Sequence, residues 1–470
     1  MTSTDIILLF LTVGAIGLLV LAVTRWKVNA FIALAMAALV VGIGAVAMGL
    51  AEIALVKDAT GVPAWKTGKA LTVLSIIDAF QIGMGNTLGK TAAIIALGTM
   101  LGKLLAESGG AEVLAKRFAA FFGPRHVGLC IMSLALVVGL VTWFAVGLVL
   151  LLPILLTLTR ETKRPFLLLA IPLLSCLSVM HGLMPPHPGP VAAVGNLGAN
   201  TGKVLLWGFL IGIPVAIVAG PIFARRAIRY VSADAPLPEL IAAPGTPRIL
   251  PGFGITFFTI LFPIVLMLLA TVAELLLKEG APVRTFASFL GNPTLALTLS
   301  VLLAMWTLGK ATGFSGAEVL RFTEQSVGSV GMTLLVVGGG GGFAKVLDIA
   351  GVSRAMGSLA EAAHLSPLLY GWLVSAFIRV ATGSATVAIT VASGLLVPVL
   401  AQNPGTNVEL LVICIGCGSL FLSHLNDGGF WIVKDCLGLT VGQTLRTWTV
   451  CETIVGLAGL ALTLLVSAFV

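Results

Sequence analysis

The stretch Met180-His181-Gly182-Leu183-Met184-Pro185-Pro186-His187-Pro188-Gly189-Pro190 lies between two long apolar runs. Proline removes an amide donor and clashes with the preceding helical turn, so a helix cannot run through four prolines in eleven residues. Broken backbone at membrane depth is tolerated only where it is buried in protein or lines a wet cavity. The stretch therefore predicts a helix interrupted beside a substrate path, with His181 and His187 at the break.

A second stretch with the same character, Ser423-His424-Leu425-Asn426-Asp427-Gly428-Gly429-Phe430, lies far downstream. It also interrupts an apolar run, and it also has a histidine. Two interrupted helices at corresponding places in two halves of a chain are the best sequence indication of a transporter's binding site. The pair therefore predicts a membrane transporter built from two related halves.

Composition agrees with a membrane protein. Of the 470 residues, 58% are hydrophobic and only 10% are charged, whereas a soluble domain is about 25% charged. The apolar runs are roughly 18–25 residues long, which is the length a helix needs to cross a bilayer. The net charge of +8 does not indicate nucleic-acid binding. Lys and Arg lie at the ends of apolar runs, where the positive charge of cytoplasmic loops is expected.

The first half is predicted to cover residues 1–230. Within it we expect a loop over 51–69 and an interruption of the apolar region 71–106 at Gly83-Met84-Gly85-Asn86. Arg125 and Arg160 flank the apolar segment 127–159, and positive residues favour the cytoplasmic side. About 32 residues are too few for two spans of roughly 20 residues each. We therefore predict a re-entrant helical hairpin near 127–159, followed by the broken helix near 181–190.

The second half is predicted to cover residues 251–470, after a proline-rich cytoplasmic linker at 231–250. It contains a second hairpin near 366–402 and the broken helix near 423–430. Counting positive clusters along the chain orients this half opposite to the first. The predicted fold is all-α and polytopic, with two inverted repeats, about ten transmembrane helices and two re-entrant hairpins. Both termini are then periplasmic.

A direct internal match supports the repeat. The segment 98–105 resembles 340–347, and Ser108-Gly109 resembles Ala350-Gly351 at the same offset. The two histidine-containing breaks lie at nearly that offset as well. Inverted repeats place a binding site at their interface, so we expect both breaks and both hairpin tips to surround one cavity.

In these motifs the chain resembles the gluconate permease family of proton-coupled symporters, within the wider ion-transporter superfamily. The resemblance rests on 181–190, on 383–388, on 423–431, and on 101–105 with 107–111, and it covers essentially the whole chain. The proline-histidine and asparagine-aspartate motifs are specific to the family, whereas the glycine-rich ones are not.

The resemblance implies proton-coupled symport of gluconate or a related sugar acid into the cell, by alternating access across the bacterial inner membrane. Its partners are then a small anionic substrate, protons and the lipid bilayer, with no nucleic acid and no cofactor; a homo-oligomer stays open. Some members of the family transport other small hydroxy or amino acids. A symporter of D-serine or of a short hydroxy acid is therefore the alternative.

Candidate substrate-binding residues lie at the breaks and hairpin tips. Asn426 offers a donor and an acceptor to sugar hydroxyls, although it could instead only end a helix in an Asx turn; Ser423 belongs to the same stretch. Thr142, Ser384 and Thr386 lie at tips, where free amides and a helix N-terminus favour an anion. Their alternative role is to bond the backbone of the turn itself.

Arg379 lies about twelve residues into the second hairpin, roughly 18 Å along a helix. Its guanidinium could bind a carboxylate or form a structural ion pair with Asp348 or Asp427.

For proton coupling we rank Asp427 first, because an intramembrane carboxylate is a functional hypothesis by default. His181 is second, since histidine titrates near neutral pH, and Glu107 is third.

His187 joins His181 among the substrate-binding candidates, although both imidazoles could instead bond carbonyls freed at the break. Neither has Cys, Asp or Glu nearby in sequence, so we expect no metal site.

Two other classes of membrane protein fit the sequence less well. A membrane-embedded enzyme would need a ligand cluster or a nucleophile–base pair, and a channel rarely shows inverted repeats with paired breaks. We therefore predict a transporter and not an enzyme.

Overall fold

The computed structural model describes residues 2–57, 63–229, 231, 249–362 and 365–470. Most of the predicted linker, 232–248, lies outside the described residues. The elements of the first half, in order, are α1 (Ser3–Thr24), α2 (Ala30–Ala47), β1 (Ala51–Lys57), β2 (Pro63–Ala70), α3 (Val73–Glu107), α4 (Gly110–Phe122), η1 (Pro124–His126), α5 (Val127–Gly139), α6 (Phe144–Thr162), α7 (Phe166–Leu183), α8 (Pro188–Leu197), α9 (Thr201–Ile217), η2 (Val218–Ile222) and α10 (Phe223–Ala227).

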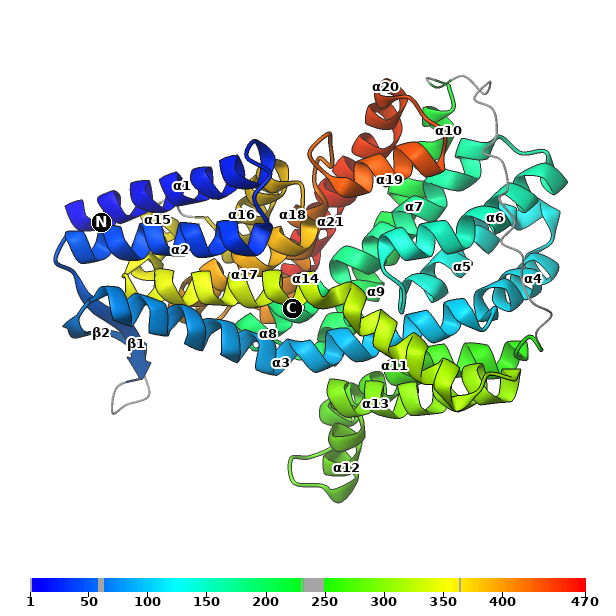
Figure 1. Cartoon of the computed structure of the whole chain (residues 1–470), viewed down its shortest axis with the longest axis horizontal. Helices are drawn as coiled ribbons and strands as arrows, with labels where there is room; N and C mark the ends of the chain where they lie inside the picture. Colours follow the sequence, from blue (N-terminus) through cyan, green and yellow to red (C-terminus); the bar gives the residue numbers. More distant parts are fainter. Residues whose placement is uncertain (1, 58–62, 230, 232–248, 363–364) are drawn as a thin grey trace.

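The elements after the predicted linker are also mainly long and short helices (Figure 1). These elements are α11 (Phe253–Leu276), α12 (Pro282–Leu290), α13 (Pro293–Ala304), η3 (Met305–Gly309), η4 (Lys310–Thr312), α14 (Gly316–Ile349), α15 (Val352–Ala362), α16 (Pro367–Thr382), α17 (Ala385–Gln402), α18 (Val408–Leu420), α19 (Gly428–Cys436), α20 (Val441–Thr444), η5 (Leu445–Thr449) and α21 (Val450–Ser467). That the halves are inverted in the membrane stays a prediction.

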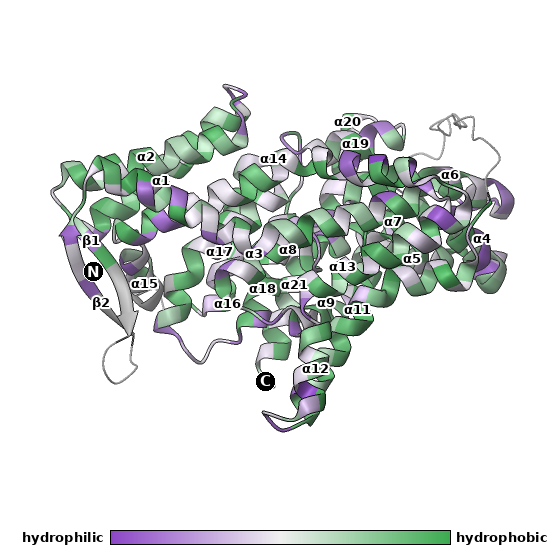
Figure 2. Cartoon of the chain, turned by 60° about the horizontal axis from the view of Figure 1, so that its bottom comes forward, coloured by the Kyte–Doolittle hydropathy of each residue, from purple (hydrophilic) through white to green (hydrophobic). Residues whose placement is uncertain are grey.

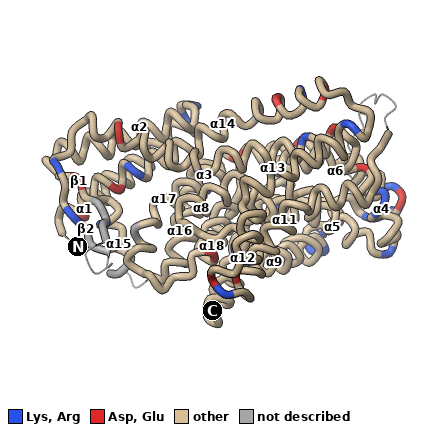
Figure 3. The backbone as a smooth tube through the Cα atoms, turned by 90° about the horizontal axis from the view of Figure 1, so that it is seen from below, with Lys and Arg blue, Asp and Glu red and all other residues tan. Residues whose placement is uncertain are grey.

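The protein is an all-α membrane protein. Eleven of the described helices are long and apolar enough to cross a bilayer, or up to twelve if a bent pair counts as one span. Apolar residues colour most of each long helix (Figure 2), and charged residues gather at helix ends and connections, for example around α4 and the β1–β2 hairpin (Figure 3). Large apolar side chains such as Phe10, Leu74 and Leu276 are more than 70% exposed, as lipid-facing residues are. With no water in the bilayer, helices satisfy every backbone group within the segment.

Two sequence expectations about α3 and its approach are wrong. Residues 51–57 and 63–70 form an antiparallel hairpin, with Ala51 opposite Ala70 and Ile53 opposite Thr67, where we expected a loop. The region 71–106 is not interrupted at 83–86, because α3 is one helix of 35 residues. Glycine in a helix costs only about 1 kcal/mol, and here the glycines permit close packing: a Cβ on Gly83 would strike the Gly341 carbonyl of α14.

The centre of the molecule is formed by α7 and α18, the helices that end at the two predicted breaks. The span containing α7 is 83% buried, the highest fraction among the candidate spans, and every residue of α18 from Leu410 to Leu420 is buried. The two cross closely, because a Cβ on Gly182 would strike the Leu420 side chain and one on Gly416 would strike the Gly182 carbonyl. Both breaks therefore lie side by side in the core.

Candidate functional site

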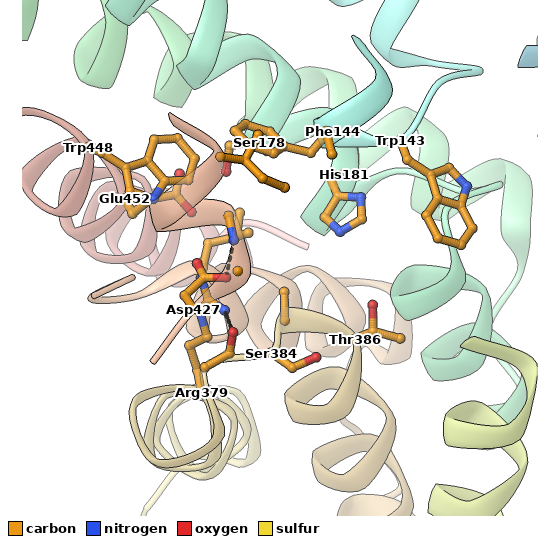
Figure 4. Close-up of a pocket in the computed structure, with 17 residues that line it drawn as sticks. Trp143, Phe144, Ser178, His181, Arg379, Ser384, Thr386, Asp427, Trp448 and Glu452 are labelled. Atoms are coloured by element: carbon orange, nitrogen blue, oxygen red, sulfur yellow. Dashed lines mark hydrogen bonds and ion pairs between the residues drawn. The ribbon is translucent and has the colours of Figure 1, made fainter. Parts of the chain in front are cut away.

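A cavity of about 320 Å³ lies where the predicted breaks and tips meet. Its walls come from the turn between α5 and α6, the end of α7, the turn between α16 and α17, the segment before α19, and the η5–α21 helix (Figure 4). The polar and aromatic side chains that line it are Trp143, Phe144, Ser178, His181, Arg379, Ser384, Thr386, Asp427, Trp448 and Glu452. Segments far apart in sequence therefore form one site.

Three helices begin at this cavity. Phe144 and Ala145 belong to the first turn of α6, Ala385 and Thr386 to that of α17, and Gly428 and Gly429 to that of α19. The first amides of a helix lack intrahelical partners and carry partial positive charge. Trp143 caps α6 without a side-chain hydrogen bond, so that end keeps its amides free of a side-chain cap. The arrangement can bind an anion.

Arg379 and Asp427 form a buried ion pair at the edge of the cavity. The arginine donates from Nη2 to the Asp427 carboxylate at 2.5 Å and from Nη1 to the Gly383 carbonyl at 2.6 Å. Their side chains are 4% and 11% exposed. Of the two roles considered for Arg379, the structure shows the ion pair, and it shows Asp427 as the partner and not Asp348, which pairs with Lys345.

The second break is fixed around the Asp427 carboxylate. Asp427 also accepts hydrogen bonds from the Ser423 hydroxyl and from the Gly429 amide, so it caps α19. Ser423 in turn accepts from the Trp448 indole at 2.8 Å. Ser423 does not line the cavity, and its hydroxyl is committed to Asp427.

A glycine fixes the second tip against this break. Gly383 has a φ of +73°, a left-handed conformation that favours glycine, and a Cβ there would strike the Asn426 backbone. Asn426 donates to the carbonyls of Val380 and Ala381 at the end of α16. Its side chain therefore joins the break to the tip and does not line the cavity.

The two histidines have different places. His181 lines the cavity, and its Nδ1 is buried without a hydrogen-bond partner in the described chain. His187 is 3% exposed and lies outside the lining, with one ring nitrogen 3.0 Å from the Met184 carbonyl and the other 3.1 Å from the Thr142 carbonyl. It bonds carbonyls across the first break and the first tip, which is the structural role considered for it.

Two further candidates lie away from the cavity. The Thr142 hydroxyl, in the turn after α5, donates to the Val138 carbonyl near the end of α5, so it bonds the local backbone. Glu107 forms an ion pair with Lys103 one turn earlier in α3, at 2.6 Å, and both side chains are about one-third exposed.

Two candidates at the second tip, Ser384 and Thr386, do line the cavity. Ser384 also caps α17 through the Val387 amide.

Sequence reasoning missed Glu452 and Ser178. Glu452 is 1% exposed and lines the cavity from α21. The sequence does contain a signal for Glu452, because a carboxylate within the apolar last span is a functional hypothesis by default. Ser178, one turn before His181 on α7, had no distinguishing signal in the sequence.

Within the described part of the chain, no group of three or more His, Cys, Asp or Glu side chains could hold a metal ion.

The chain matches known permeases along its whole length. Residues 6–469 match the family described as "GntP family permease". It is 41% identical to the gluconate permease of Zymomonas mobilis, over 98% of each chain. It is 42% identical to the gluconate permease of Pseudomonas aeruginosa, over 98% of this chain and 97% of the relative. The Gnt-II system L-idonate transporter of Escherichia coli is 37% identical, over 98% and 99%.

The fold has a counterpart of known structure. The chain aligns with the Neisseria gonorrhoeae protein MtrF, described in a study of antimetabolite efflux pumps, with a TM-score of 0.66 over 94% of this chain and 96% of MtrF. At 14% identity, this likeness shows the fold alone. The similarity to relatives is much higher and extends over the complete length, and those relatives are permeases and transporters, not enzymes. The chain is thus a multi-pass membrane permease that belongs to the GntP permease family.

Proposed function

We propose that the protein is a secondary active transporter that binds gluconate or a related sugar acid in the cavity and carries it into the cell together with protons, by alternating access. Relatives at about 40% identity are named gluconate permeases, and one is named an L-idonate transporter. Gluconate and idonate are both polyhydroxy acids with one carboxylate. The substrate must therefore present an anionic head and several hydroxyls.

The observation that supports an anionic substrate most strongly is the convergence of three helix N-termini on one cavity. Each helix N-terminus carries about half a positive charge and directed amides. The start of α6 has no side-chain cap, whereas Ser384 bonds the Val387 amide of α17 and Asp427 bonds the Gly429 amide of α19. The low dielectric of a buried site strengthens these contributions. A carboxylate placed among the first turns of α6, α17 and α19 would receive amide hydrogen bonds without requiring Arg379 to leave Asp427.

The remaining lining suits the rest of a sugar acid. Ser384, Thr386 and Ser178 offer hydroxyls that both donate and accept, and His181 has an unpartnered ring nitrogen. Trp143 and Trp448 add apolar surface at the cavity wall. A polyhydroxy chain has hydroxyl edges and C–H surfaces, so both kinds of contact are needed.

Proton coupling follows from the charge of the substrate. The cell interior is negative, and moving one anion inward against 100 mV costs about 2.3 kcal/mol. Carrying one proton with each anion removes that cost and leaves the pH gradient as the driving force. The cavity contains titratable side chains that could bind such a proton.

We further propose that the protein lies in the bacterial inner membrane with both termini periplasmic, and that 1–230 and 251–470 are inverted repeats. The positive residues that flank 127–159 support this orientation. Cysteines introduced at Arg125 and Arg160 should react alike with an impermeant thiol reagent in intact cells. Opposite accessibility would reject the re-entrant hairpin and the inversion.

The transport proposal is tested with purified protein in proteoliposomes. We expect labelled gluconate to accumulate when the outside is acidic and only to equilibrate without a pH gradient. Unlabelled idonate should compete, whereas D-serine should not. Competition by D-serine but not by idonate would favour the amino-acid alternative, and uptake independent of the pH gradient would reject proton coupling.

A further inference from the structure

Glu452 is the one carboxylate in the lining of the cavity that has no ion-pair partner among the described residues. It lies in the first turn of α21, is 1% exposed, and its Oε1 has no hydrogen-bond partner in the described chain. The Ser178 hydroxyl lies near it and likewise has no partner that meets hydrogen-bond geometry. Figure 4 shows Glu452 on the cavity wall beside Trp448. A buried charge without a partner is costly, so this carboxyl needs a ligand.

The charges around Glu452 leave it uncompensated. Arg379 and Asp427 both lie close enough to act on it electrostatically, but they neutralise one another in their own ion pair. With Glu452 ionised, the three side chains together carry one negative charge. With Glu452 protonated, they carry none.

Other titratable groups do not change this balance. The elements packed against α21 are α7, α9, α16, α18, η2 and η5. Their titratable side chains, besides Arg379, are His181, Cys176, Cys414, Cys417, Tyr370, Glu409, Lys203 and Arg446. Arg446 is exposed to the outside, Cys417 lies against Gly459 two turns further along α21, and Lys203 does not line the cavity. Of these groups besides Arg379, His181 alone lines the cavity together with Glu452.

From this geometry we infer that Glu452 binds the transported proton and that Asp427 positions Arg379 and the start of α19. The inference deepens the proposed function and rests on it. Protonating Asp427 instead would leave Arg379 buried without a counter-charge and would weaken three hydrogen bonds to one carboxylate. Protonating Glu452 breaks no ion pair.

Coupling between proton and substrate follows from their shared cavity. An ionised Glu452 repels a carboxylate bound among the helix N-termini, and a protonated one does not. By linkage, bound anion increases the affinity of Glu452 for its proton by the same factor by which the proton increases the affinity for the anion. Loading the two together and releasing them together is what a symporter requires.

The first experiment counts protons on the purified protein. Gluconate binding is measured by titration calorimetry in two buffers of different ionisation enthalpy, which gives the number of protons taken up per gluconate. At alkaline pH, where Glu452 of the free protein is ionised, the wild type should take up close to one proton per gluconate, and Glu452→Gln should take up none while still binding gluconate. Glu409→Gln is the matched control, because Glu409 is half-buried on α18, outside the cavity lining, and it should keep the wild-type count.

Transport in proteoliposomes separates this inference from the proposed function. Glu452→Gln should still exchange labelled for unlabelled gluconate but should lose accumulation driven by a pH gradient, by tenfold or more. If the wild type itself fails to respond to the gradient, the proposed function fails. If the wild type responds and Glu452→Gln keeps a normal response, only the assignment of Glu452 is overturned.

A third measurement covers the case in which Glu452→Gln does not fold. Infrared difference spectra of the wild type should show a protonated-carboxyl C=O band that gluconate induces, and Glu452→Asp should shift its frequency. A band that appears on gluconate addition and is unchanged in Glu452→Asp would place the proton on another group and overturn the inference.

Discussion

The two helix breaks lie side by side in the core but are stabilised in different ways. The first, between α7 and α8, is built from prolines, and the His187 ring lies between the Met184 and Thr142 carbonyls, to one of which a neutral imidazole donates. The second, between α18 and α19, is built around a carboxylate with an arginine, a hydroxyl and an amide bonded to it. The difference teaches that one break is fixed by neutral backbone contacts, whereas the other depends on a buried pair of charges.

The largest effect is expected from breaking the charged pair. Arg379→Met should destabilise the protein by about 3–5 kcal/mol, because it leaves the Asp427 carboxylate buried without a counter-charge. Thermal unfolding in detergent, followed by size-exclusion chromatography, measures the loss. The double variant Arg379→Met/Asp427→Asn should recover a large part of it. A single variant that unfolds at the wild-type temperature would show that the second break does not depend on the ion pair.

The first break should respond less to loss of its histidine. His187→Phe fills the space but removes the ring N–H that bonds the Met184 or the Thr142 carbonyl, and we expect a loss of about 1–3 kcal/mol. His187→Gln should lose less, since its amide can still donate to a carbonyl. Both are compared with Arg379→Met in the same unfolding assay. If His187→Phe costs more than Arg379→Met, the ranking of the two breaks is reversed.

A smaller effect is expected at the tip beside the second break. Ser384→Ala removes the side-chain cap of α17, which should cost about 1 kcal/mol of stability. It should also raise the KM for gluconate uptake several-fold, because the hydroxyl lines the cavity. Ser366→Ala is the control: Ser366 caps α16 through the Leu369 amide outside the cavity, so its KM should not change. Equal KM values for both variants would remove Ser384 from the substrate site.

The smallest effect is expected from Glu107, a proton-coupling candidate by sequence. Its ion pair with Lys103 is about one-third exposed, and such i,i+4 pairs contribute only about 0.3–0.5 kcal/mol. Glu107→Gln should therefore unfold near the wild-type temperature and keep uptake driven by the pH gradient. Loss of that uptake would mean that protons pass through α3 and would contradict the assignment of the proton to Glu452.

The sequence by itself determined the class of protein and the places where its helices stop. Proline, glycine and charge act locally on the backbone, so both breaks and both tips could be located from the chain alone. Five of the predicted site residues, His181, Arg379, Ser384, Thr386 and Asp427, do line the cavity. The continuity of α3 through Gly83 could not be predicted, because only the close approach of α14 explains why glycine is there.

Only the tertiary structure decided which side chain meets which. Arg379 had two acidic partners available by sequence, and packing brings it to Asp427, 48 residues away, and leaves Asp348 to Lys345. The Thr142 hydroxyl bonds the Val138 carbonyl of the preceding helix, and packing brings Glu452 to the cavity. Hydrophobic periodicity fixes where a helix lies along the chain, but the contacts of a buried polar group depend on which helices cross beside it, and that is a property of the assembled core.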